Sequence, residues 1–273
     1  MAILRTTLLL GILTAILLGF GFLLGGTGGV AIAFGFALLI NFVSYWFSDK
    51  IVLGIYRAQP LKDKKIEGMV QRIAKGAEIP VPKLYFVDLP VPNAFATGRN
   101  PEHSAVAVTR GLKELMNDEE IEGVLAHELS HIKNRDTLVS TIAATVGGAI
   151  SFLANMAWWL SIGGDSRKGG FIYLLPLVIL APISAALVQM AISRGRELQA
   201  DYTGALITKN PLGLASALQK LGAAAKAHPI KGNPASAHLW IVNPFSAGWI
   251  AGLFSTHPPI EERIRKLKEM KMR

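Results

Sequence analysis

Long stretches without any charged residue alternate with charged segments along the chain. The uncharged stretches cover Thr6–Ser48, Thr137–Gly164 and Gly169–Ser193. The first stretch is interrupted by the glycine-rich run Gly25–Gly29, so it divides into two apolar halves. Each half, and each of the other two stretches, can supply the ~20 apolar residues that a membrane-spanning helix needs. The pattern therefore predicts two membrane hairpins, at residues 1–48 and 137–193.

Each predicted hairpin has an alternative interpretation. The first apolar half could be a secretory signal peptide, but Arg5 alone makes a poor charged region, and a second apolar half follows without a polar mature start. Four residues of the second hairpin are polar or break helices: Asn155, Pro176, Pro182 and Gln189. This hairpin could therefore be buried in protein or only half inserted into the bilayer.

The remaining residues form two charged blocks, 49–136 and 194–273, whose apolar positions recur with helical or strand periods. The predicted elements are an amphipathic helix around Ile66–Ile73, strands at Leu84–Val87 and Ser104–Thr109, a helix after Asn117 and a helix at Ile260–Met270. Together with the apolar hairpins, they predict a mainly α-helical, multi-pass membrane protein with a small α+β region.

The helix after Asn117 contains the sequence His-Glu-Leu-Ser-His, at residues 127–131. Asn117 and Glu120 have the spacing of a capping box. An apolar stripe at helical spacing consists of Ile121, Leu125, Leu129 and Ile132. His127 and His131 are four residues apart and share a different face, so we expect them to lie outside the apolar core.

Composition agrees with a membrane protein. The chain is 51% hydrophobic and only 17% charged, where a soluble domain carries about 25% charged residues. It contains no cysteine, so disulfides and thiolate metal sites are excluded. The formal net charge is +9, but no DNA- or RNA-binding pattern accompanies it, and we expect no nucleic-acid partner.

The basic residues indicate an orientation. Those next to the predicted spans are Lys50, Arg57, Lys62, Lys64 and Lys65 after the second span, and Arg194 and Arg196 after the fourth. The turn between the first two spans is uncharged, whereas Arg167 and Lys168 argue mildly for the opposite orientation. The positive-inside rule then places both charged blocks in the cytoplasm, with basic side chains against anionic lipid headgroups of the bilayer.

The spacing of the two histidines is that of a zinc site. Two imidazoles on one helical face can bind one zinc ion, and Glu128 beside the metal can take a proton from a metal-bound water. The motif would occur by chance roughly 0.006 times in a chain of this composition. The alternative is a helix with two unrelated surface histidines.

A catalytic zinc site needs a third protein ligand. Glu197 and Asp201 are four residues apart and can share one face of a second helix. One carboxylate can bind the metal while the other orients a ligand histidine. The alternative is a helical turn with solvated Arg–Glu pairs.

Four motifs together resemble the HtpX-type membrane zinc metalloproteases, which are gluzincins. They are Asn93–Gly98, His127–His131, Glu197 with Asp201, and Ser255–Pro259 followed by Glu261–Arg263. The resemblance implies a gluzincin-like catalytic region that binds one zinc ion (Zn2+) per chain. It also implies His127, His131 and Glu197 as ligands and Glu128 as the catalytic base. Finally, it implies protein quality control of membrane proteins.

The resemblance adds two further expectations. Asn93-Ala94-Phe95 resembles the edge-strand segment that pairs with extended substrates in gluzincins, although Asn93 could simply form a turn. In CAAX-type prenyl endopeptidases, a histidine before proline and an arginine six residues on support the transition state. His257 and Arg263 have this spacing, so His257 could stabilise the oxyanion, or it could be a capping or packing histidine.

The predicted ligands lie close to the second apolar hairpin. His131 is six residues before Thr137, about 9 Å along a helix at ~1.5 Å per residue, and Glu197 follows Ser193 by four residues. We therefore expect a zinc endopeptidase that cuts membrane-protein or polypeptide substrates at the cytoplasmic membrane surface. The alternatives are a CAAX-type prenyl endopeptidase, which has more spans, and a non-catalytic membrane scaffold or chaperone.

Overall fold

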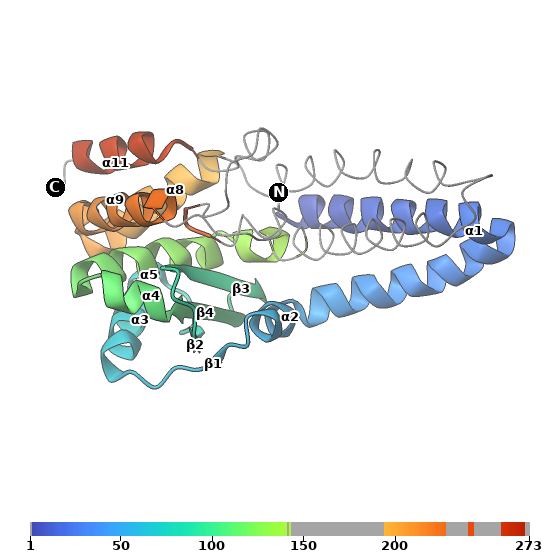
Figure 1. The fold of residues 1–273 in the computed structure, drawn as a ribbon, viewed down its shortest axis with the longest axis horizontal. Helices are drawn as coiled ribbons and strands as arrows, with labels where there is room; N and C mark the ends of the chain where they lie inside the picture. Colours follow the sequence, from blue (N-terminus) through green and yellow to red (C-terminus); the bar gives the residue numbers. More distant parts are fainter. Residues whose placement is uncertain (1, 141, 143–193, 228–239, 243–257, 271–273) are drawn as a thin grey trace.

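In the computed structural model of the chain, residues 2–140, 142, 194–227, 240–242 and 258–270 are described. They form a helical arm and a body (Figure 1). The arm is α1 (Ala2–Trp46), and the body comprises the described residues from α2 (Ser48–Ile55) onward. The body is mostly helical and contains one small mixed sheet, as the sequence predicts.

The arm is a hairpin that turns at two glycines. Gly25 and Gly26 have non-helical backbone angles, and the φ of 57° at Gly26 lies in the left-handed region that glycine tolerates best. The two halves lie side by side in opposite directions (Figure 1). A hydrogen bond joins them, from Asn41 Nδ2 in the second half to Thr14 Oγ1 in the first, at 2.9 Å. The turn predicted from the glycine-rich run is therefore confirmed.

The second half of the arm has the properties of a membrane span. Gly25–Trp46 is long and apolar enough to cross a bilayer, with a mean hydropathy of 1.8, whereas Thr6–Gly19 is a shorter apolar helix. Large apolar side chains of the second half are exposed, including Ile32, Phe36, Leu39 and Phe42. The described residues thus contain one candidate span, where we expected two. Residues 143–193 of the second predicted hairpin lie outside the described residues, so the multi-pass topology stays a prediction.

The body's sheet has the strand order β1-β2-β4-β3. Its strands are β1 (Gln59–Pro60), β2 (Lys83–Val87), β3 (Ala94–Asn100) and β4 (His103–Thr109). β2 pairs with β4 in parallel, and the other two pairs are antiparallel. Both predicted strands are confirmed, and the Asn93-Ala94-Phe95 segment leads into β3 at the edge of the sheet.

Helices pack against this sheet and against one another. They are α3 (Lys64–Ala77), α4 (Arg110–Leu115), α5 (Asp118–Lys133), α8 (Arg194–Thr208), α9 (Pro211–Ala227) and α11 (Ile260–Glu269). α5 is central, because α3, α8, α9 and β3 all contact it. The main apolar core surrounds α5 and includes Val70, Val106, Val124 and Leu218.

α5 begins and packs as its sequence predicts. The Asn117 side chain accepts from the Glu120 N–H, and the Glu120 carboxylate accepts from the Asn117 N–H, which completes a capping box. The predicted apolar stripe is buried. The two histidines lie outside the apolar core, as expected. His127 is nevertheless only 1% exposed, because α8 and α11 cover this face of α5 with charged side chains.

Candidate metal centre

Three predicted ligands meet where α5 packs against α8. One ligand atom each from His127, His131 and Glu197 lies within 4.8 Å of the others. The Nε2 atoms of the two histidines are 3.2 Å apart. The Glu197 carboxylate oxygens lie 3.7 Å from His127 Nε2 and 3.4 Å from His131 Nε2. Two turns of α5 and the first turn of α8 thus present two nitrogens and a carboxylate to one point.

These distances fit a tetrahedral zinc ion. Two ligand atoms bound to one zinc at about 2.0–2.1 Å and at the tetrahedral angle lie about 3.3–3.4 Å apart. The 3.2 Å between the two histidine nitrogens lies close to this value, and the nearest Glu197 oxygen lies 3.7 Å from one of them and a different Glu197 oxygen 3.4 Å from the other. Two imidazoles and one carboxylate are also a ligand set found in catalytic zinc sites.

Each histidine is oriented by a carboxylate on its other nitrogen. His127 Nδ1 lies 2.9 Å from Asp201 Oδ1, and His131 Nδ1 lies 3.2 Å from Asp136 Oδ2. When each Nδ1 carries the proton and donates it to the carboxylate, each Nε2 keeps a lone pair for a metal. Asp201 therefore lies where the sequence analysis expected an orienting group.

Asp136 is a functional candidate that the sequence analysis missed. It follows the turn after α5, in which Arg135 has a φ of 58°, and this turn brings its carboxylate back to His131. Arg196 Nη1, from α8, donates to the other Asp136 oxygen at 2.8 Å. The available signal was an aspartate five residues after the second motif histidine.

Arg263 joins α11 to this centre. It is 1% exposed and binds Asp201 through two parallel bonds, with Nε and Nη2 each 2.7 Å from a carboxylate oxygen. Its Nη1 donates to the Ile241 carbonyl at 3.1 Å and lies 3.5 Å from a Glu197 oxygen. Burial raises the pKa of Asp201, but Arg263 and His127 together lower it by more, to about 2. Arg263 thus keeps Asp201 ionised as the partner of His127.

Glu128 lies beside the ligands and is buried. Its carboxylate accepts a hydrogen bond from the Ala96 backbone N–H of β3. Burial raises the pKa of Glu128 to about 7. Burial lowers the pKa of His131, but the Asp136 hydrogen bond and nearby carboxylates raise it by more, to about 9. Burial lowers the pKa of His127. A bound dication would favour ionised Glu128 and neutral histidines.

The predicted substrate segment lies at the edge of the sheet, but its side chains point into the protein. Asn93 Oδ1 accepts from the Ile241 N–H at 3.2 Å, and the Phe95 ring packs 5.1 Å from the Tyr56 ring. Asn93, Ala94 and Phe95 are all buried. The side chains of this segment are therefore not available to a partner beyond the edge.

His257 lies outside the described residues, so its catalytic role stays a prediction. Arg263, which was paired with it by spacing, is described and binds Asp201 instead of facing open space.

A glycine sets the distance between the two helices that carry the ligands. A Cβ on Gly204 of α8 would lie 3.0 Å from the Ala126 carbonyl carbon and 3.0 Å from the His127 nitrogen of α5. Real Cβ atoms rarely approach other atoms this closely, so a larger residue would push α8 away from α5. Glu197 and Asp201 would move with α8.

We therefore expect Gly204→Val to weaken metal binding and to reduce the free energy of unfolding by about 1–3 kcal/mol, the usual effect of overpacking. Gly68→Val on α3 is a matched control, because a Cβ there meets only the Arg72 side chain, at 3.8 Å. Zinc titration and chemical denaturation of both variants provide the measurements. Wild-type zinc affinity in Gly204→Val would show that this close approach does not set the site.

Known proteins resemble this chain in sequence. The profile of peptidase family M48 matches residues 60–271. A "Protease HtpX homolog" of Desulfatibacillum aliphaticivorans is 54% identical over 272 residues, covering 96% of this chain and 88% of the relative. A protein of the same name from Pyrococcus furiosus is 52% identical, covering 98% of this chain and 96% of the relative.

A solved structure shares the fold. The crystal structure of S. mikatae Ste24p matches with a TM-score of 0.55 at 18% identity. The match covers 94% of this chain and spans 62% of the length of Ste24p. Because the family profile covers well over half of the chain and the relatives match nearly all of it, the protein belongs to peptidase family M48 and is a metalloprotease of the HtpX type.

Proposed function

We propose that the protein is a zinc-dependent membrane endopeptidase that cleaves membrane proteins, including misfolded or damaged ones, at the cytoplasmic surface. The observation that carries this proposal is the meeting of His127, His131 and Glu197 atoms within 4.8 Å. Each histidine of the group has its second nitrogen beside a carboxylate, which is the arrangement of a metal ligand rather than of a packing residue.

In the proposed reaction, His127, His131 and Glu197 would hold one zinc ion, which would supply Lewis-acid chemistry at the scissile carbonyl. Glu128 takes a proton from the attacking water and later returns it to the leaving amine. The Ala96 N–H fixes the position of the Glu128 carboxylate before the reaction. Asp201 and Asp136 keep the ligand histidines in the required tautomer, and Arg263 positions Asp201.

The edge of β3 is the proposed substrate-binding element. Ala96 belongs to β3 and contacts Glu128, so a chain lying along this edge would pass the catalytic groups. An extended substrate can add to such an edge through backbone hydrogen bonds, without regard to sequence. Asn93 positions the start of this strand, and His257 is the proposed oxyanion donor.

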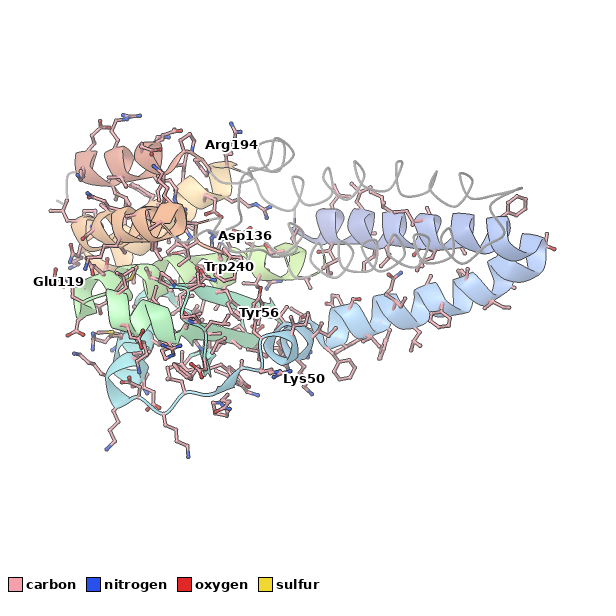
Figure 2. The ribbon with its side chains drawn as sticks, viewed as in Figure 1. Lys50, Tyr56, Glu119, Asp136, Arg194 and Trp240 are labelled. Atoms are coloured by element: carbon pink, nitrogen blue, oxygen red, sulfur yellow. The ribbon has the colours of Figure 1, made fainter. Side chains whose placement is uncertain are left out.

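The arm supports the proposed membrane location. Asp136 lies at the end of the body that joins the arm, whereas Glu119, at the start of α5, lies at the opposite end (Figure 2). The metal centre is thus on the arm side of the body. Lys50 and Arg194 lie on the same side, where basic residues would meet anionic lipids on the cytoplasmic face (Figure 2).

The CAAX-type alternative is not better supported. The likeness to Ste24p at 18% identity concerns the fold alone, whereas the relatives of about half identity carry the HtpX name.

Cleavage of an unfolded protein tests the proposed function. Purified full-length protein, stripped of metal by a chelator, should not cut casein, and one equivalent of zinc should restore cleavage because the three ligands form one site. Magnesium serves as the control, since it prefers oxygen ligands in octahedral geometry. Equal cleavage with and without zinc would contradict the proposal.

A further inference from the structure

β3 ends at the part of the body that faces the membrane. Arg99, its penultimate residue, donates a hydrogen bond from Nη1 to the carbonyl of Trp46 at 3.1 Å. The Arg99 guanidinium also lies 4.7 Å from the centre of the Trp46 ring. Trp46 is the last residue of α1 and of the candidate span. The carboxyl end of β3 therefore contacts the residue at which the candidate span ends.

A second contact places the same end of β3 next to the other apolar segment. Thr137 Oγ1 donates to the Gly98 carbonyl at 3.0 Å, and Thr137 is the first residue of the uncharged stretch after the motif. The start of β3 is held differently, because Asn93 binds Thr109 and Ile241 of the body. β3 therefore has a defined direction, from the body toward the bilayer.

The outer edge of β3 shows which backbone groups a substrate can reach. β3 pairs with β4 on one side, and the described residues contain no strand on its other side. The Ala96 N–H bonds to Glu128 and the Gly98 carbonyl accepts from Thr137, so neither group pairs with β4. The backbone N–H and carbonyl groups of alternate residues, from Ala94 onward, therefore point to the outer edge of the sheet. Thr137 closes the edge at Gly98, so a substrate would pair with the outward backbone groups of Ala94 and Ala96, beside Glu128. Both residues are buried, at 0% and 7% exposed, so a bound chain has to displace the groups that cover this edge.

We propose that a substrate chain adds antiparallel to β3, with the residues before the scissile bond toward the bilayer and the residues after it pointing away. Antiparallel pairs are about two to three times commoner than parallel pairs and slightly more stable per residue. Because β3 runs toward the bilayer, an antiparallel partner runs away from it. This inference rests on the proposed function and specifies its substrate class.

The preferred substrate is then a segment that leaves the bilayer in the amino-to-carboxyl direction. Such segments are tails that follow a final span and the first part of loops. Ala96 is three residues before Arg99, about 10 Å at ~3.3 Å per residue, so the cut should fall within roughly ten residues of the span. A segment that precedes a span has the opposite direction and fits only if it is long enough to fold back.

Two matched substrates test this direction. Each has the same single span and the same ten-residue cleavable segment, placed directly after the span in one and directly before it in the other. Each is reconstituted with the wild-type protein in lipid nanodiscs, where both faces are accessible. We expect the segment after the span to be cut at least tenfold faster. Equal rates, or faster cleavage before the span, would overturn the inference.

Linker length and a free peptide complete the test. Separating the segment from the span by a flexible Gly/Ser linker of about 40 residues should make the two rates equal, because such a linker lets the chain turn back. A rate difference that survives the long linker would also overturn the inference, since direction would not be its cause. The free ten-residue peptide should be cut by wild type and not by Glu128→Gln. Failure to cut the free peptide would overturn the proposed function itself.

Discussion

Glu128→Gln should reduce proteolysis by about 10²–10⁴-fold, the usual contribution of a general acid–base group. The amide has the size of the carboxylate but cannot take a proton from water. Glu128 is not among the three grouped ligand residues, so zinc content should remain at the wild-type value. Cleavage of a fluorogenic casein and metal analysis of the same preparation are the measurements.

Glu122→Gln is the matched control for this variant. Glu122 lies on the same helix but binds Arg72 at the protein surface, away from the ligands. We expect wild-type zinc content and wild-type cleavage from it. If Glu128→Gln cleaves casein as fast as Glu122→Gln does, Glu128 is not the base.

The second large effect is expected from Glu197→Ala, which removes a carboxylate from the metal centre. The variant should lose bound zinc and all measurable proteolysis, because two histidines alone do not make a catalytic zinc site. The fold should survive, since Arg263 keeps its two bonds to Asp201. Metal analysis after dialysis measures the loss, and circular dichroism tests the fold.

Asp136→Asn gives the comparison for this loss. The amide oxygen can still accept from His131 Nδ1, so Asp136→Asn should weaken zinc binding by no more than the about 10–100-fold that loss of such an outer partner typically causes. Asp201→Ala is a poorer comparison, because it would leave the buried Arg263 without its main partner, at a cost of about 3–5 kcal/mol. Full zinc occupancy in Glu197→Ala would mean that the third ligand lies elsewhere.

The parts of the site that the sequence predicted depend on local spacing. The capping box at Asn117 and the four-residue intervals in α5 and α8 fix which side chains share a face of one helix. The edge position of β3 followed from the resemblance of Asn93-Ala94-Phe95 to a known segment. These local patterns could not predict which side chains from other elements contact the residues on each helix face.

Three features needed the folded structure for that reason. The Arg263–Asp201 pair joins residues 62 positions apart, and spacing had instead suggested a partnership with His257. The Asp136–His131 pair depends on a turn in which Arg135 adopts a positive φ, which no sequence pattern announced. His127 is buried although it lies off the apolar stripe, because ionised groups can cover a helix face when they pair with one another.

X-ray absorption at the zinc edge of the purified full-length protein tests the central claim most directly. The account predicts one zinc ion per chain, with two imidazole nitrogens and a carboxylate oxygen at about 2.0–2.1 Å. It also predicts that this signal and casein cleavage disappear together in Glu197→Ala. A protein that cleaves casein without bound zinc, or a zinc shell without two imidazoles, would contradict the account.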